Sequence, residues 1–130
     1  EMKSYKYTLL DVAEDEMKKA CDKDATTTCF VEGDKVIIDL GRERTITSFH
    51  YLPDQSEYNK GLISGYEIAV GIDANAINTV VKQGEFSNIK HNPILQSVYF
   101  TPINARYISL KPTKMINEGE QMGFGEIAIR

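Results

Sequence analysis

The feature that most constrains the fold is a succession of short β-forming runs from Lys35 to the end of the chain. These runs are rich in Val, Ile, Tyr, Phe and Thr, and Gly, Pro, Asn and Asp separate them. Such a pattern is typical of antiparallel sandwiches, so we predict an all-β fold of two facing sheets. Including one run before Lys35, the eight predicted strands lie near residues 5–10, 35–40, 45–52, 62–72, 80–86, 95–101, 105–110 and 125–130.

One short helix is predicted in the N-terminal segment. Asp11 can cap its start, and the three acidic residues at 14–16 occupy its first turn. Lys18 and Lys19 fall in its last turn, which matches the helix dipole. This helix ends where an acidic loop begins.

Composition indicates one soluble domain over residues 1–130, because a chain of this length buries roughly two-thirds of its unfolded surface. The net charge is −4, and the 15 basic residues are scattered rather than clustered, so nucleic acid is not an expected partner. No apolar run is long enough for a membrane span. The chain begins with Glu1 and has no signal-type segment, so we expect it to be excised from a longer protein.

The two cysteines, Cys21 and Cys29, are too few for a disulfide framework. They also lack the histidine or second cysteine pair that a zinc site needs. Two interpretations stay open: both are small buried hydrophobic residues, or they form a local disulfide around the acidic loop.

Asp22, Asp24 and Thr27 form an oxygen-rich loop, and Glu126 is an acid in the predicted last strand. Oxygen ligands of this kind suit a hard cation such as calcium. An EF-hand is excluded, because its sixth position holds Thr27 instead of Gly and its twelfth holds Gly33 instead of Glu. The alternative is a solvated acidic turn in which the lysine between the two acids compensates part of their repulsion.

Six segments, in this order along nearly the whole chain, together resemble the discoidin-like, coagulation factor V/VIII type C domain. They are residues 20–27, 36–41, 46–53, 65–70, 105–110 and 125–127. The resemblance implies an eight-stranded jelly-roll sandwich. More narrowly, residues 51–55 and 84–90 look like C-terminal modules of bacterial fucosidases and hexosaminidases, which are grouped with family 32 carbohydrate-binding modules. A non-catalytic module of a secreted or periplasmic glycoside hydrolase is therefore implied.

The resemblance also implies a structural calcium ion that joins the N-terminal loop to the last strand. Lys19 and Gly125 would each supply a backbone carbonyl. The side-chain ligands would be those of Asp22, Asp24, Thr27 and Glu126.

Carbohydrate is the implied ligand, of the terminal galactose, N-acetylhexosamine or fucose type, bound by loops at one end of the sandwich. A sugar ring has an apolar face and a polar rim, so its site pairs an aromatic ring with hydrogen-bonding side chains. The candidate residues are Glu32, Asp54, Gln55, Tyr58 and Asn117. Two departures weaken the match: Asp54 stands where many members have Arg, and Cys29 or Phe30 stands where Trp is frequent.

The alternative is a structural accessory domain that packs on the catalytic domain of the parent enzyme without binding sugar. Catalysis by this domain is disfavoured, because a small sandwich without an evident cleft offers no site for a glycosidase carboxylate pair. His50 is expected to be an exposed or partly covered strand residue rather than a ligand contact.

Overall fold

The computed structural model describes residues 3–13, 15–16, 28–56, 59–87 and 89–130. Within them the elements are eight strands, all paired antiparallel, so the predicted all-β fold is confirmed. The strands are β1 (Thr8–Leu9), β2 (Cys29–Val31), β3 (Val36–Leu52), β4 (Ile63–Gly71), β5 (Thr79–Glu85), β6 (Gln96–Met115), β7 (Met122–Phe124) and β8 (Glu126–Ile129). In this part of the chain, no helix has the length and apolar character to cross a membrane.

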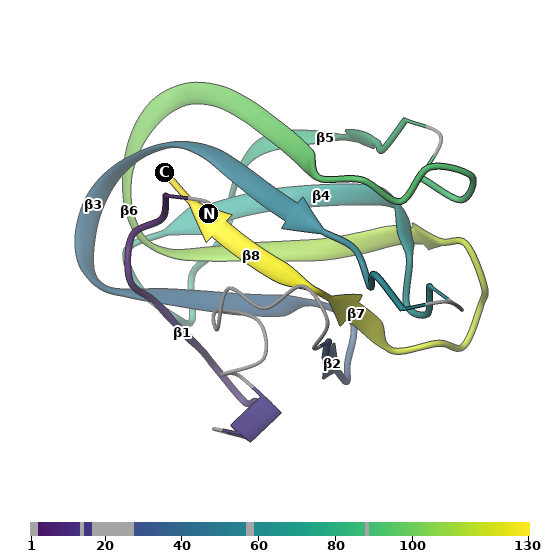
Figure 1. The fold of residues 1–130 in the computed structure, drawn as a ribbon. Helices are drawn as coiled ribbons and strands as arrows, with labels where there is room; N and C mark the ends of the chain where they lie inside the picture. Colours follow the sequence, from purple (N-terminus) through teal and green to yellow (C-terminus); the bar gives the residue numbers. More distant parts are fainter. Residues whose placement is uncertain (1–2, 14, 17–27, 57–58, 88) are drawn as a thin grey trace.

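The two long strands β3 and β6 build both layers of the sandwich, because each curves from one layer into the other (Figure 1). Pairing between them is shifted in register between Asp39 and Arg44 and again between Ile46 and Ser48. Such bulges bend a strand without ending it. The sequence prediction was wrong here: it divided β3 and β6 into four separate strands.

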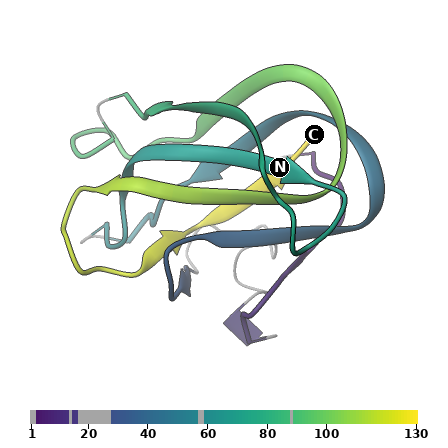
Figure 2. The same ribbon diagram turned by 180° about the vertical axis from the view of Figure 1, so that it is seen from behind.

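One layer contains β1, the first half of β3, the second half of β6, β4 and β5, in that order. The other contains β8, the second half of β3 and the first half of β6 (Figures 1 and 2). Their inner faces pack together, and the largest fully buried side chains include Ile38, Phe49, Tyr51, Ile108 and Ile129. Burial of this apolar surface is the main stabilising contribution.

A separate two-stranded sheet, β2 with β7, was not predicted. Each strand has three residues, too few to show a period, and β7 contains Gly123. Cys29 pairs with Phe124, and both are fully buried. Burial of Cys29 was expected; Cys21 lies outside the described residues, so the disulfide stays a prediction.

The short N-terminal helix is not among the elements of the described residues, although Asp15 and Glu16 have helical geometry. Asp11 is not its cap, because it lies in a turn with φ of 59°, whereas a capping residue has extended backbone. The remaining predicted helical positions, 14 and 17–19, lie outside the described residues.

The N-terminal segment runs along the free edge of β8. The Tyr5 amide donates to the Ile129 carbonyl at 2.8 Å, and the Tyr7 hydroxyl donates to the Ile127 carbonyl at 2.7 Å. Ala128, between these two isoleucines, is also buried. The alternation of Ile127 and Ile129 with polar or small residues predicts a last strand with one solvated face, and the burial of Ala128 shows that this prediction is wrong.

His50 is buried, contrary to the expectation of an exposed or partly covered residue. Its Nε2 lies 2.8 Å from the Ser48 hydroxyl and its Nδ1 lies 2.8 Å from the Ser97 hydroxyl. Burial lowers the pKa of His50, and the charge of Arg130 lowers it further. A neutral ring satisfied by two hydroxyls is a structural element of this strand pair rather than a ligand contact.

Candidate functional site

Three segments gather at the end of the sandwich where β3 ends and β4 begins (Figure 1). We call them together the loop end; their described residues are 28–33, 53–56 with 59–62, and 116–121. The Gln121 amide donates to Glu32 at 2.9 Å, which joins the first and last of these segments. The amide of Gly123 in β7 donates to the Gly61 carbonyl at 3.0 Å, which joins the middle one to the β2–β7 sheet.

Asp54 organises the middle segment from inside. Its carboxylate accepts hydrogen bonds from the Ser56 amide at 2.9 Å and hydroxyl at 2.6 Å, the Thr28 hydroxyl at 2.7 Å and the Lys60 amide at 2.9 Å. Burial alone raises the pKa of Asp54, but these hydrogen bonds outweigh it and hold the pKa below its usual value. Asp54 is 2% exposed, so the structure places this predicted sugar contact as a support of the loop.

Gly61 allows two backbone segments to approach closely. Its φ is 72°, and a Cβ atom there would lie 2.4 Å from the Gly123 nitrogen and 2.5 Å from the Gln121 oxygen. The Glu120 carboxylate accepts a hydrogen bond from the Gly61 amide at 3.1 Å. Only a residue without a side chain fits this contact.

Gln55, another predicted sugar contact, is exposed and bridges two loops. Its Nε2 donates to the Pro53 carbonyl at 2.9 Å and to the Pro93 carbonyl at 2.8 Å. The segment that leads into β6 is thereby tied to the loop end. Gln55 lies at the loop end, and its amide nitrogen donates to backbone carbonyls; its contact with sugar stays a prediction.

Of the remaining predicted contacts, two lie at the loop end and one lies outside the described residues. Asn117 is exposed at the loop end and donates to Glu120 at 3.4 Å. Glu32 is exposed beside Gln121, as described above. Tyr58, the predicted stacking residue, lies outside the described residues.

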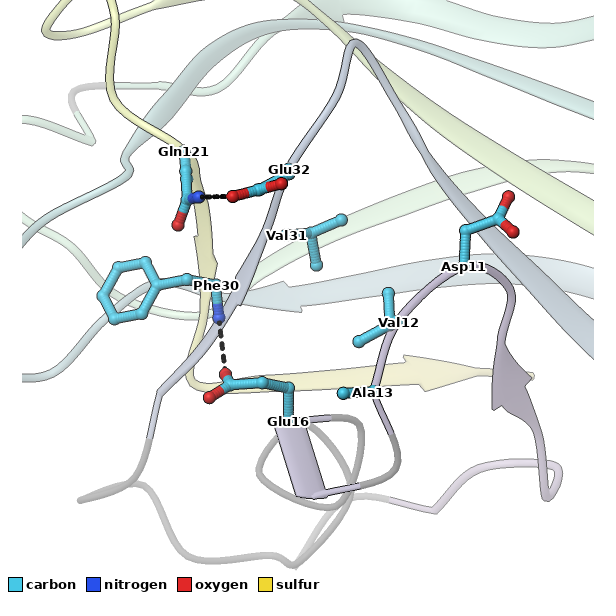
Figure 3. Close-up of a pocket in the computed structure, with 8 residues that line it drawn as sticks. All are labelled: Asp11, Val12, Ala13, Glu16, Phe30, Val31, Glu32 and Gln121. Carbon is cyan, nitrogen blue, oxygen red and sulfur yellow. Dashed lines mark hydrogen bonds between the residues drawn. The ribbon is translucent and has the colours of Figure 1, made fainter.

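Phe30 is an exposed aromatic residue at the loop end that was not among the predicted sugar contacts. It stands in β2 between buried Cys29 and Val31 and is 36% exposed. Its ring points away from Val12 (Figure 3) and lies against Gly123, where an added Cβ would be 3.1 Å from the ring. The Phe30 ring, the Glu32 carboxylate and the Gln121 amide thus lie at neighbouring strand ends. A sugar ring requires this combination of an apolar face and hydrogen-bonding groups.

A pocket of about 450 Å³ lies on the side of β2 that faces the N-terminal turn (Figure 3). Residues 11–13 and Glu16 form one wall, and residues 30–32 with Gln121 form the other. The amide of Phe30 donates to Glu16 at 3.4 Å across this space. The pocket therefore borders the loop end and shares residues with it.

The predicted calcium ligands are described only in part. Gly125 and Glu126 stand at the start of β8, where the Gly125 amide donates to the Leu52 carbonyl at 2.8 Å. No group of three or more His, Cys, Asp or Glu gathers for a metal among the residues that are described. The other predicted ligands lie outside them: Lys19, Asp22, Asp24 and Thr27.

Comparison with known proteins places these features in a family. The F5/8 type C domain family matches residues 13–128. CpGH89CBM32-5 from Clostridium perfringens, in complex with GalNAc-beta-1,3-galactose, has a TM-score of 0.76 at 20% identity, over 95% of this chain and 93% of that chain. The family 32 module of C. perfringens NanJ, in complex with galactose, has a TM-score of 0.72 at 22% identity, over 95% and 91%.

A longer protein also matches. A glycoside hydrolase 29 family member from an unknown rumen bacterium has a TM-score of 0.70 at 32% identity, over 79% of this chain. The match spans 18% of that hydrolase chain. No curated protein sequence matches. The match over residues 13–128, together with the fold, shows that the chain belongs to the F5/8 type C domain family.

Proposed function

We propose that the chain is a non-catalytic module that binds carbohydrate at the loop end, with Phe30 as the stacking residue. The observation that carries this proposal is the exposed Phe30 ring beside the hydrogen-bonded pair of Glu32 and Gln121. The ring supplies an apolar face for the C–H side of a pyranose. The carboxylate accepts from sugar hydroxyls, and the amide both donates and accepts.

Supporting residues hold this surface in shape. Asp54 fixes the segment that ends at Gly61, and the Gly61–Gly123 contact holds that segment against β7 beside the Phe30 ring. A site that is ordered before binding loses less entropy when the sugar arrives. The ligand class we propose is a terminal galactose, N-acetylhexosamine or fucose, and the sugars bound by two similar structures support it.

We further propose that the domain is attached to an extracytoplasmic glycoside hydrolase of the fucosidase or hexosaminidase type. The match to part of a longer glycoside hydrolase supports such an arrangement. A linked module raises the effective concentration of the enzyme at a glycan surface, so weak binding at one site is sufficient.

Replacing Phe30 with Ala tests the stacking role. We expect the affinity for the best-bound of these sugars to fall by about 30-fold, which corresponds to about 2 kcal/mol for a central aromatic contact. Isothermal titration calorimetry measures this loss, and a thermal melt checks that the variant is folded. Tyr99→Ala is the matched control, because Tyr99 is 63% exposed on β6 outside the loop end. Unchanged affinity in Phe30→Ala contradicts the proposal.

The alternative function is a structural accessory domain that contacts the catalytic domain. The exposed side chains of Ile72, directly after β4, and of Val80, in β5, favour it. Under this alternative the folded domain binds no sugar, and charged substitutions at these two positions lower the activity of the parent enzyme.

We also propose that calcium binds through the predicted ligands and joins the N-terminal loop to β8. Gly125 and Glu126 support this role, because Gly125 directly precedes β8 and Glu126 is the first residue of that strand. An ion that binds only the folded state stabilises it, by about 2.7 kcal/mol when the free ion concentration is 100 times the dissociation constant. The melting temperature is therefore expected to fall when a chelator removes calcium, and to fall less in Glu126→Gln. Identical melting with calcium and with chelator contradicts this proposal.

A further inference from the structure

Each layer of the sandwich has two edge strands, and three of these four edges are protected against pairing with another strand. β1 has only two residues. β5 exposes Lys82 and Glu85 along its length. The edge of β8 is covered, because the Ser4 hydroxyl accepts from the Ile129 amide at 3.0 Å and the Tyr5 amide donates to the Ile129 carbonyl. Short length, charge and covering are the usual means by which a protein keeps a sheet edge unpaired.

The fourth edge, the first half of β6, has none of these protections. Residues 96–99 pair with β3 on one side, and no strand of the described residues pairs with them on the other. This part of β6, drawn in green, lies at the rim of the fold (Figure 1). Residues 92–105 are the longest run in the chain without Asp, Glu, Lys or Arg. Exposed apolar and aromatic side chains stand on this run, those of Ile94, Leu95 and Tyr99.

The outer face beside this edge carries small side chains next to the Tyr99 ring. His50 on the neighbouring β3 is buried, and the Tyr99 ring packs edge-on against it with the ring centroids 5.9 Å apart. Ser97 stands opposite His50, and its hydroxyl lies 2.8 Å from Nδ1 of that ring. The Tyr99 ring is thus held beside the edge, and the small Ser97 leaves room for a second aromatic ring.

We propose that this edge is a dimerisation site, at which the first half of β6 pairs antiparallel with the same strand of a second copy of the chain. Pro93 and Pro102 have no amide hydrogen, so the pairing is confined to the residues between them. A two-fold axis at Val98, perpendicular to the sheet, keeps the buried faces of the two strands on the same side. It places Tyr99 of each copy beside Ser97 of the other.

The lack of charge favours a second copy as the occupant. In a two-fold pair, charged side chains near the axis approach their own equivalents and repel them. β5 shows the conflict, because Lys82 in the middle of that strand would approach Lys82 of a second copy. The first half of β6 has no such repulsion. Pairing about a two-fold axis also occupies this edge in both copies, so association ends at the dimer.

Sedimentation velocity of the intact domain over a range of protein concentrations measures the association. One short strand pair is at the small end of specific interfaces, so we expect a dissociation constant on the order of 10–100 μM. Amide hydrogen exchange gives a second readout. Exchange at residues 96–101 should slow as the protein concentration rises, while exchange in β5 should not change.

Tyr99→Lys and Tyr99→Glu are the informative variants. Each alone places like charges diagonally across the axis, twice in every dimer, and we expect each to weaken dimerisation about tenfold or more. An equimolar mixture of the two should regain the dimer, because opposite charges then face each other. Mixing cannot rescue a variant that has misfolded. Val80→Lys is the matched control, because Val80 is exposed on the other unpaired edge, β5, and should leave the dimer unchanged.

Several results would overturn this dimer. A domain that stays monomeric over the whole range contradicts it, and so does growth beyond two copies. A dimer that persists in Tyr99→Lys, or that Val80→Lys disrupts equally, uses a different surface. Protection of residues 96–101 only in a longer protein that carries the domain would assign the edge to another domain of that protein, and self-pairing would then be wrong.

Discussion

Gly61→Ala is expected to destabilise the domain by about 4 kcal/mol and to abolish the ordered loop end. Two costs combine at this position. The backbone φ of 72° is strained for any residue with a Cβ atom, and that atom would lie 2.4 Å from the Gly123 nitrogen. The obstructing atoms are backbone atoms of β7, so no side-chain rotation can relieve the contact.

A second glycine provides the matched control. Gly119 has a φ of 84°, but nothing lies within 4 Å of its added Cβ atom. Gly119→Ala therefore incurs the conformational cost alone, about 1 kcal/mol. Urea denaturation of both variants measures the difference. Equal destabilisation of the two would mean that the close approach of residues 61 and 123 does not hold the loop end together.

Asp54→Ala is expected to cost about 3 kcal/mol of folding stability. The substitution removes the acceptor for four hydrogen bonds and leaves the Ser56 and Lys60 amides without it. Asp73→Ala is the control, because the Asp73 carboxylate accepts from the Asn75 amide at 2.9 Å in an exposed turn. We expect that control to lose about 0.5 kcal/mol.

The pH dependence of stability gives Asp54 a second readout. Its pKa in the folded state is lower than in the unfolded chain, so the stabilisation is present above the unfolded pKa of about 3.9. It is lost as the pH falls through the folded pKa. Asp54→Ala should lack this part of the acid dependence, and a variant that keeps the wild-type profile would contradict the role of Asp54 as an ionised support.

The strands could be predicted from sequence where one face meets the core. Alternation in Val36–Leu40 is the period of a strand with one buried face, and the structure confirms this segment. The strand around Phe49 and Tyr51 is confirmed as well, but both of its faces are covered there, because His50 is also buried. The intervening residues 41–44 resemble a loop, because they combine a glycine with three charged side chains. They instead form the bend of β3, which depends on pairing with β6 across the register shift.

The candidate site could be predicted only in part. The order of the loops along the chain was enough to predict that Glu32, Gln55 and Asn117 lie at one end of the sandwich. The role of Asp54 depends on donors 26 residues before it and six residues after it, a combination that has no local signature. Phe30 is exposed because of the way β2 pairs with β7. Both strands are too short to show a period from which this exposure could be predicted.

The most direct test of carbohydrate binding at the loop end is a heteronuclear NMR titration of the domain, in calcium, with galactose, N-acetylgalactosamine, N-acetylglucosamine and fucose. We predict saturable shifts that cluster at Phe30, Glu32, Lys60 and Gln121 for at least one of these sugars. No shifts from any sugar in a well-folded sample, or saturable shifts confined to β5 or to the surroundings of Tyr99, would contradict the proposed function.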